Sequence, residues 1–147
     1  MRWISNKFKP QTPILDTIRY RSKLEHDVAL QLKQTGVKFE YETLKIPYTV
    51  PERSSTYMPD FILGDIIIEV KGSWFDSEDR QKLIRVKEQH PHLDIRIVFD
   101  RANSKIYKGS KTTLGKWAED HGFPYADKGT IPLSWLLEAK ERLKTQN

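Results

Sequence analysis

The sequence predicts an α/β fold in which a mixed central β-sheet is flanked by helices. Apolar residues recur at helical spacing over residues 22–34, and apolar and polar residues alternate along residues 93–99. An apolar stretch at residues 61–68 is divided by the turn Gly64-Asp65. The 147 residues can bury one core but would be crowded as two domains. We therefore expect a single domain over residues 16–147.

The N-terminal region is expected to contain an arm and a helix. Residues 1–15 carry three cations and two prolines and show no periodicity, which predicts a flexible basic arm. From Ser22 to Gln34 the apolar residues recur at every fourth position. Because Ser22 is suited to cap a helix and Gly36 to end one, the pattern predicts a helix between them.

Residues 37–50 are expected to form an unusually long extended segment. Apolar residues alternate along it, but the alternation changes phase midway, which indicates a bulge or a crossing. Pro47 cannot donate a backbone hydrogen bond and therefore fits an edge or bridge position. Residues 52–57, after Pro51, read as a polar loop. The whole segment is suited to extend away from the domain to which it belongs.

A hairpin is expected over residues 59–71, followed by a second helix and a further strand. The helix begins at Asp76 or Ser77 and ends near residue 90, where a proline follows. Residues 93–99 then alternate as a strand does. Such an order of elements is typical of a sheet with helices packed on it.

The C-terminal third is expected to contain a short strand and two helices. Ile106-Tyr107 is the strand candidate, and Thr112 or Thr113 begins a helix that stops at Gly122. Pro132 suits the first position of a last helix. Three leucines of that helix are expected to face inward: Leu133, Leu136 and Leu137.

Composition excludes several classes of chemistry. Cysteine is absent, which rules out disulfides, thiolate metal sites and cysteine nucleophiles. Lys and Arg number 25 against 20 Asp and Glu, and the resulting charge of +5 favours polyanionic partners. No apolar stretch approaches a membrane span, and the N-terminus does not resemble a signal peptide. We expect a soluble, intracellular protein with no membrane partner.

Two carboxylates and a lysine at the ends of the expected hairpin point to a chemistry. Asp60 follows the first extended run, and Glu69 and Lys71 share one face of the next strand because they are two residues apart. Phosphodiester hydrolysis needs an attacking hydroxide and relief of developing charge, which divalent ions provide. Carboxylates prefer hard ions such as Mg2+ or Mn2+, and the Val70 carbonyl offers a further oxygen. The pattern thus predicts metal-dependent phosphodiester cleavage.

The role of Lys71 stays open at this point between orienting or deprotonating water and neutralising the phosphate. A structural interpretation of the three residues also exists, since Asp often follows Pro in turns and half-exposed strands often carry Glu and Lys. The apolar run Ile66-Ile67-Ile68 favours the functional interpretation. A strand this apolar is buried on both faces, where unpaired charge is penalised, so Glu69 and Lys71 need partners.

Glu25 is the candidate for a third carboxylate. It lies in the first turn of the first helix, in the order Ser-Lys-Leu-Glu that is typical of a capping box. In that role its side chain reaches back to the amide of Ser22, and spacing alone favours the cap. The two roles do not exclude each other.

The histidines and other motifs add no second site. The four histidines do not cluster, and three of them lie near helix ends, where they commonly serve the cap or the dipole. Gly-rich phosphate loops, Ser-based triads and dinucleotide fingerprints are missing, so no nucleotide cofactor is expected.

Two groups of cations are candidates for contacts with DNA phosphates. Solvated faces often carry such runs, but an acidic pocket repels DNA unless a metal fills it and nearby cations attract the backbone. Trp74, in an apparent loop just after Lys71, is a candidate for stacking on a base. The cations are Arg80, Lys82, Arg85 and Lys87 on the second helix and Lys105, Lys108 and Lys111 around the Tyr107 region.

The acidic residues and lysine together resemble the PD-(D/E)xK nuclease superfamily. Longer stretches are similar to the bacteriophage endonuclease I family of Holliday-junction resolvases, over about residues 21–135. These stretches are Phe39-Glu40-Tyr41-Glu42, Ile46-Pro47-Tyr48, Tyr57-Met58-Pro59-Asp60-Phe61, Glu88-Gln89-His90-Pro91, Leu93 to Phe99 and Tyr107-Lys108-Gly109-Ser110.

The resemblance implies a restriction-endonuclease-like core and paired nicks in four-way and other branched DNA. It implies that Glu25, Asp60, Glu69 and Lys71 are catalytic and that the Val70 carbonyl joins the first three as a metal ligand. It also implies an intertwined homodimer in which residues 43–51 bridge the subunits, so that each site takes Glu25 from the other chain. A phage origin would place the enzyme in the host cytoplasm.

Two other interpretations of the sequence remain. A restriction, mismatch-repair or transposon-end nuclease with the same core would depend strongly on DNA sequence. A DNA-binding module with vestigial acids would stabilise branches without cutting them. Complete retention of the acids and the lysine argues against a vestigial site.

Overall fold

The computed structural model describes residues 14–145, apart from residues 16, 51 and 52. The expected basic arm therefore lies outside the described residues, except for its last positions. The elements in chain order are β1 (Ile14–Leu15), β2 (Ile18–Arg19), α1 (Lys23–Gln34), β3 (Glu40–Tyr41), β4 (Ile46–Val50), β5 (Arg53–Tyr57), β6 (Phe61–Leu63), β7 (Ile66–Lys71), α2 (Ser77–Gln89), β8 (Asp94–Phe99), α3 (Leu114–Asp120), β9 (Tyr125–Ala126) and α4 (Leu133–Thr145).

The central sheet is mixed, as predicted. Its strands lie in the order β3-β6-β7-β8-β9. The pairs β3–β6 and β6–β7 are antiparallel, whereas β7–β8 and β8–β9 are parallel. The tight turn at Gly64, whose φ is +67°, makes the β6–β7 hairpin, while the parallel β7–β8 pair needs a crossover, which α2 provides.

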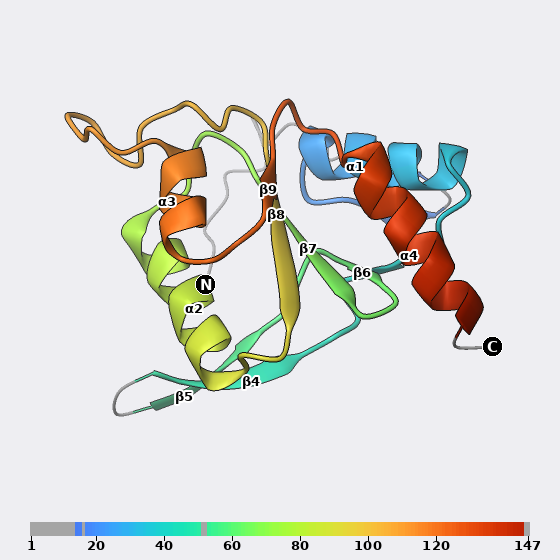
Figure 1. Cartoon of the computed structure of the whole chain (residues 1–147), viewed down its shortest axis with the longest axis horizontal. Coiled ribbons are helices and arrows are strands. Elements are labelled where there is room, and N and C mark those ends of the chain that lie inside the picture. Colours follow the sequence, from blue (N-terminus) through green and yellow to red (C-terminus); the bar gives the residue numbers. More distant parts are fainter. Residues whose placement is uncertain (1–13, 16, 51–52, 146–147) are drawn as a thin grey trace, which may run out of the picture.

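Helices cover both faces of this sheet, so the molecule has three layers. α2 and α3 lie on one face, and α1 and α4 lie on the other (Figure 1). β7 serves both layers, because Ile67 packs toward α2 whereas Ile66 and Ile68 pack toward α1 and α4. By this alternation Glu69 and Lys71 project from the α2 face.

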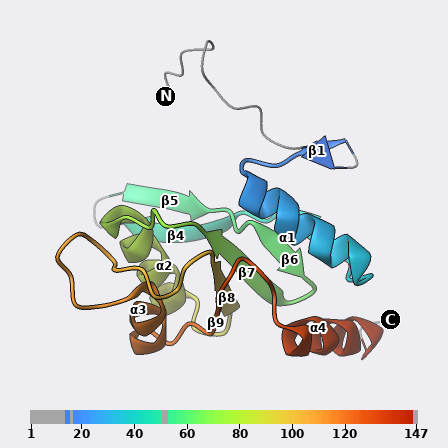
Figure 2. The same cartoon turned by 90° about the horizontal axis from the view of Figure 1, so that it is seen from above.

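The β4–β5 hairpin forms a separate two-stranded sheet. The prediction of a polar loop at residues 52–57 is thus wrong for Arg53–Tyr57, which is strand β5. The hairpin lies along α2 (Figure 2), where the Gln89 side chain bonds both the amide and the carbonyl of Thr49, at 2.6 and 2.8 Å. Glu42, with φ of +52°, ends β3 and accounts for the predicted change of phase.

The helix predictions hold at their capped ends. Ser22, Asp76 and Thr113 each accept a hydrogen bond from the amide three residues onward, as N-cap residues do. Gly36 and Gly122 follow α1 and α3 with positive φ. Among the described residues, no helix is both long and apolar enough to span a membrane.

Three predictions in the C-terminal third need correction. Ile106-Tyr107 is loop, and only Lys105 forms an isolated bridge there, with Thr113. β9 was not predicted, because two residues are too few to show a period. Leu136 is buried as expected, but Leu133 and Leu137 are 66% and 54% exposed.

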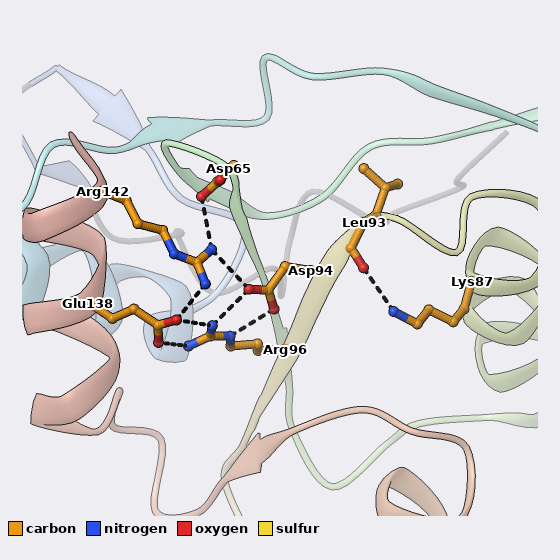
Figure 3. A network of polar contacts seen from close by, with 7 residues as sticks. All are labelled: Asp65, Lys87, Leu93, Asp94, Arg96, Glu138 and Arg142. Atoms are coloured by element: carbon orange, nitrogen blue, oxygen red, sulfur yellow. Dashed lines mark hydrogen bonds and ion pairs between the residues drawn. The ribbon is translucent and has the colours of Figure 1, made fainter. Parts of the chain in front are cut away.

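Ion pairs hold α4 against the start of β8 (Figure 3). Arg96 is buried and donates to Asp94 at 2.9 and 2.7 Å and to Glu138 at 2.9 and 3.1 Å. Arg142 joins the same carboxylates and also Asp65 at 3.0 Å. Further along α4, Leu143 lies so near the β6–β7 turn that a β-carbon added at Gly64 would stand 3.1 Å from it.

Candidate active site

A polar pocket of about 480 Å³ lies at the end of β7, between α1 and α2. Its lining comes from four places: the chain around the start of α1, the end of β5 with the chain that joins it to β6, the last residues of β7, and α2. Every predicted acid and the predicted lysine line it. The lining residues are Arg21, Glu25, Thr56, Tyr57, Met58, Asp60, Glu69, Val70, Lys71, Asp79, Lys82 and Leu83.

Glu69 is buried and held through both carboxylate oxygens. The hydroxyl of buried Tyr57 donates to Oε2 at 2.6 Å, and the Lys71 ammonium lies 3.4 Å from Oε1. Both contacts fix the carboxylate with its charge directed into the pocket. Tyr57 was not predicted as a site residue from spacing, because the contact depends on how the β4–β5 hairpin packs over the sheet.

Lys71 lies between two carboxylates and over an aromatic ring. Its ammonium is 3.4 Å from Glu69, 3.5 Å from Asp79 on α2, and 5.4 Å from the centroid of the Phe75 ring. Burial lowers the pKa of Lys71, but the nearby Glu69, Asp79 and Asp60 outweigh burial and raise it. The side chain is therefore an ammonium at neutral pH, which favours charge neutralisation over deprotonation of water.

Asp60 connects the hairpin to the strand that carries the other site residues. Its Oδ2 accepts a hydrogen bond from the Val70 amide at 2.8 Å. The N–H and C=O of one strand residue point to the same edge of the strand, so the Val70 carbonyl faces the side on which Asp60 lies. The carbonyl of the next residue, Lys71, faces the opposite side and accepts a hydrogen bond from the Asp100 amide. Burial, then the charges of Glu69 and Glu25, raise the pKa of Asp60 well above its usual range.

Glu25 lines the pocket and also contacts the residue that caps α1. Ser22 Oγ accepts from the Glu25 amide at 3.0 Å, which is the N-cap, and lies 3.4 Å from Glu25 Oε2. The carboxylate thus meets the Ser22 hydroxyl, whereas a capping box would direct it to the Ser22 amide. Its other oxygen accepts a hydrogen bond from the Tyr41 hydroxyl. Burial raises the pKa of Glu25, and the bond from Tyr41 opposes this.

Glu42 is a further nearby carboxylate that sequence reasoning missed. One oxygen each from Glu25, Glu42 and Asp60 lies within 4.8 Å of the others. The positive φ of Glu42 and the bond from its amide to the Asp60 carbonyl at 3.2 Å bring it there. Arg21 lies 3.3 Å from its carboxylate. Position in the sequence gave no signal for it, because it depends on the pairing of β3 with β6.

The arrangement fits a divalent, oxygen-preferring cation. Carboxylate oxygens and a backbone carbonyl are the donors that magnesium and manganese prefer. Burial first, and then neighbouring carboxylates, raise the pKa values of Asp60 and Glu25, and a bound dication would relieve the repulsion among these charges. Within the described residues, the acidic group consists of carboxylates alone.

The cations predicted to contact DNA differ in their surroundings: some bond to groups of the protein, and others are exposed to solvent. Lys82 lines the acidic pocket itself. Arg80 donates to the carbonyls of Phe75 and Ile106 at 2.5 and 3.0 Å, and Lys87 to that of Leu93 at 2.8 Å, which gives both a structural role. Lys105 lies 3.4 Å from the Lys111 carbonyl, and Lys108 is exposed. Arg85 is half-buried, and Lys111 is exposed.

The sequence is also similar to those of known phage proteins. The family model described as phage endonuclease I matches residues 9–147. "Endonuclease I" of Escherichia phage T7 is 49% identical over 125 residues, which cover 84% of this chain and 83% of the relative. "Endodeoxyribonuclease 1" of Enterobacteria phage T3 is 50% identical over 125 residues, which cover 84% and 81%.

Proposed function

The chain belongs to the phage endonuclease I family, and from this premise we propose that it resolves branched DNA. It is an endonuclease that hydrolyses DNA, and its preferred substrate on this proposal is the four-way (Holliday) junction, cut by paired metal-dependent nicks. Both relatives are phage proteins, so its place of action on the same proposal is the host cytoplasm.

The observation that carries the proposal is the meeting of Glu25, Asp60, Glu69 and Lys71 in one pocket. Asp60, Glu69, Glu25 and the Val70 carbonyl would hold Mg2+, or Mn2+ in its place. When bound, such an ion supplies an activated water and charge relief at the phosphate. We assign the same four side chains the catalytic roles.

The protein side chains orient and charge the pocket. Tyr57 fixes the Glu69 carboxylate, and Tyr41 fixes that of Glu25, so neither rotates freely when the phosphate enters. Lys71, kept protonated by its acidic neighbours, directs positive charge at the non-bridging oxygens of the scissile phosphate. Lys82 stands beside the pocket as a contact for the neighbouring phosphate.

The enzyme acts on this proposal as an intertwined homodimer with two active sites. Paired nicks need two sites, and a two-fold assembly places them symmetrically on a junction. Residues 43–51 would be the bridge, although residues 46–50 pair here with β5 of the same chain. Glu25 likewise meets Asp60, Glu69 and Lys71 of its own chain here, and the exchange would put Glu25 of a second chain in that place. The exposed residues 43–45 then connect α1 and β3 to the rest of the fold. Cations read phosphate positions, so recognition would follow shape more than base sequence.

The deciding experiment compares a synthetic four-way junction with a linear duplex of the same sequence, in magnesium. We expect symmetrical nicks in the junction and little cutting of the duplex. Lys71→Ala should abolish nicking, on the order of a thousandfold or more, while keeping junction affinity. Lys116→Ala is the matched control, because this exposed lysine of α3 pairs with Asp120, at 3.0 Å, and does not line the acidic pocket.

Other results of that experiment would point elsewhere. Equal cutting of junction and duplex would overturn structure selectivity. Cutting at fixed sequences of random duplex would instead indicate a restriction-like or repair nuclease. Tight junction binding without any nicks in magnesium or manganese would indicate a binding module.

A further inference from the structure

A second hollow, of about 750 Å³, lies beside the acidic pocket. One wall is the loop between β7 and α2, and the other is the long loop between β8 and α3, which projects from the body of the molecule (Figure 1). Its lining is mostly apolar. Two large aromatic side chains stand at its rim with unusual exposure, Trp74 at 81% and Tyr107 at 61%. We call this hollow the aromatic groove.

The aromatic groove has a fixed frame. Phe75 is buried and packs edge-on against Trp117, with ring centroids 4.9 Å apart. Arg80 ties the two walls together through the carbonyls of Phe75 and Ile106. The Tyr107 turn is closed by bonds from the Ser110 amide to the Tyr107 carbonyl and from the Ile106 amide to the Thr112 carbonyl, at 3.1 and 3.0 Å. The exposed rings are therefore held on an ordered scaffold.

The groove continues directly from the acidic pocket. Phe75 lines the groove, and the Lys71 ammonium lies 5.4 Å from the centroid of its ring. Asp79 lines the pocket and Arg80, the next residue of α2, lines the groove. A DNA strand whose phosphate reaches Lys71 thus has the groove beside its neighbouring nucleotide.

Charge on the rim indicates what the groove accepts. Lys105 and Lys108 are exposed at its edge. Exposed aromatic rings joined to lysines are the combination with which proteins hold unpaired nucleotides, since bases stack on the rings while cations meet the backbone. Such a surface accepts any base, because every base has a π-face.

We propose that the aromatic groove holds an unstacked nucleobase adjacent to the scissile phosphate, with Trp74 and Tyr107 as its stacking partners. This inference rests on the proposed function. At a branch point the strand passes between helices, so one base leaves the stack there at a lower cost than inside a continuous linear duplex. The groove would therefore add to discrimination between branched and linear DNA.

The test joins protein variants to modified junctions. Four synthetic strands form the junction, and single abasic (tetrahydrofuran) sites are placed in turn at the nucleotides on either side of the mapped nick. On the unmodified junction we expect Trp74→Ala to slow nicking by about tenfold or more, and Trp74→Phe to restore most of the rate. When the abasic site lies at the nucleotide that the groove holds, the wild-type enzyme should nick as slowly as Trp74→Ala nicks the unmodified junction. The Trp74→Ala enzyme should nick this abasic junction no more slowly than the unmodified one.

The controls separate failure of this inference from failure of the proposed function. Leu133→Ala removes an exposed apolar side chain from α4, away from the groove, and should nick like the wild type. If the wild type does not nick junctions, the proposed function fails. If it does, unchanged nicking by Trp74→Ala, or an equal further loss on every abasic junction, overturns the stacking proposal.

Discussion

The Asp60 carboxylate lowers the stability of the folded protein and is also a proposed metal ligand of the site. Its carboxylate is buried near Glu69 and Glu25, which raises its pKa well above the usual range. A carboxylic acid with a raised folded pKa binds more protons in the folded than in the unfolded chain, so the free energy of unfolding falls as pH rises. Without a metal, the ionised form destabilises the protein.

Asp60→Asn should therefore stabilise the metal-free protein. We expect its melting temperature in EDTA to exceed that of the wild type by about 3 °C near neutral to mildly alkaline pH. The difference should shrink as pH falls, because the wild-type carboxyl becomes protonated too. Asparagine keeps an oxygen that can accept from the Val70 amide, so this contact survives. Scanning calorimetry measures both temperatures.

Manganese and a second variant complete that prediction. Added Mn2+ should raise the melting temperature of the wild type and leave that of Asp60→Asn nearly unchanged. Asp120→Asn, a substitution in an exposed pair on α3, serves as the control for loss of a surface charge. A metal-free Asp60→Asn protein that melts below the wild type would contradict this view of the pocket.

Local spacing was sufficient to predict some site residues and not others. Asp60, Glu69 and Lys71 lie on one hairpin, so strand periodicity alone brings them together. Tyr57 and Asp79 line the pocket, and Tyr41 and Glu42 lie beside Glu25, only through the packing of other elements. The number of residues that separates each of them from Asp60 or Glu69 follows no regular spacing, so no periodic pattern in the sequence indicates them.

Among the elements, those with strong local signals were the ones predicted. α1, α2 and α3 have polar caps, and the β6–β7 hairpin has Gly64 at its turn. β5 was missed because Arg53–Tyr57 is almost wholly polar and gains its strand pairing from β4. The outward direction of Leu133 and Leu137 depends on how α4 meets the sheet, which sequence periodicity does not determine.

The contact between α4 and the sheet depends on Arg96. This buried guanidinium bonds two carboxylates and also lies over the Trp135 ring, 5.3 Å from its centroid. We expect Arg96→Met to lower the free energy of unfolding by about 2 kcal/mol, because within the described part of the chain Asp94 and Glu138 would keep Arg142 alone as a cationic partner. Urea denaturation measures the change, with Lys116→Met as a control in an exposed pair.

The loss caused by Arg96→Met should depend on pH. Hydrogen bonds from Arg96 lower the pKa values of both Asp94 and Glu138. Lowered pKa values contribute stability that is present above the unfolded pKa, near pH 4, and is lost as pH falls through the folded values. The difference in free energy of unfolding between the wild type and Arg96→Met should therefore become smaller as pH falls below about 4. A gap that widens in acid would show that these ion pairs do not carry the effect.

The ion-pair network of Arg96 and the acidic pocket lie in different parts of the molecule. In the register of β7 with β8, Asp94 pairs with Ile66, at the end of β7 opposite Lys71, and Arg96 pairs with Ile68. Arg96 contacts Glu138 of α4 on one face of the sheet, whereas Lys71 contacts Asp79 of α2 on the other. Five residues of strand span about 16 Å. Arg96→Met should thus leave the nicking rate of the folded enzyme close to that of the wild type.

Exchange between subunits is a prediction for the whole assembly. If each site takes Glu25 from one chain and the other three residues from its partner, two inactive variants should complement each other. We expect co-expressed Glu25→Ala and Lys71→Ala chains, purified as the heterodimer, to regain nicking through one intact site. Asp60→Asn with Lys71→Ala is the matched control, and should stay inactive. An inactive first pair would mean that each chain supplies a complete site.

The position of α4 has a practical consequence. Leu143, near its C-terminal end, adjoins the β6–β7 turn, at the end of β7 opposite Lys71. A dye or a solid support joined beyond Thr145 would stand clear of the carboxylates and of the aromatic groove. The chain therefore lends itself to immobilisation, so that individual cleavage events can be watched on a glass slide without blocking entry of the substrate.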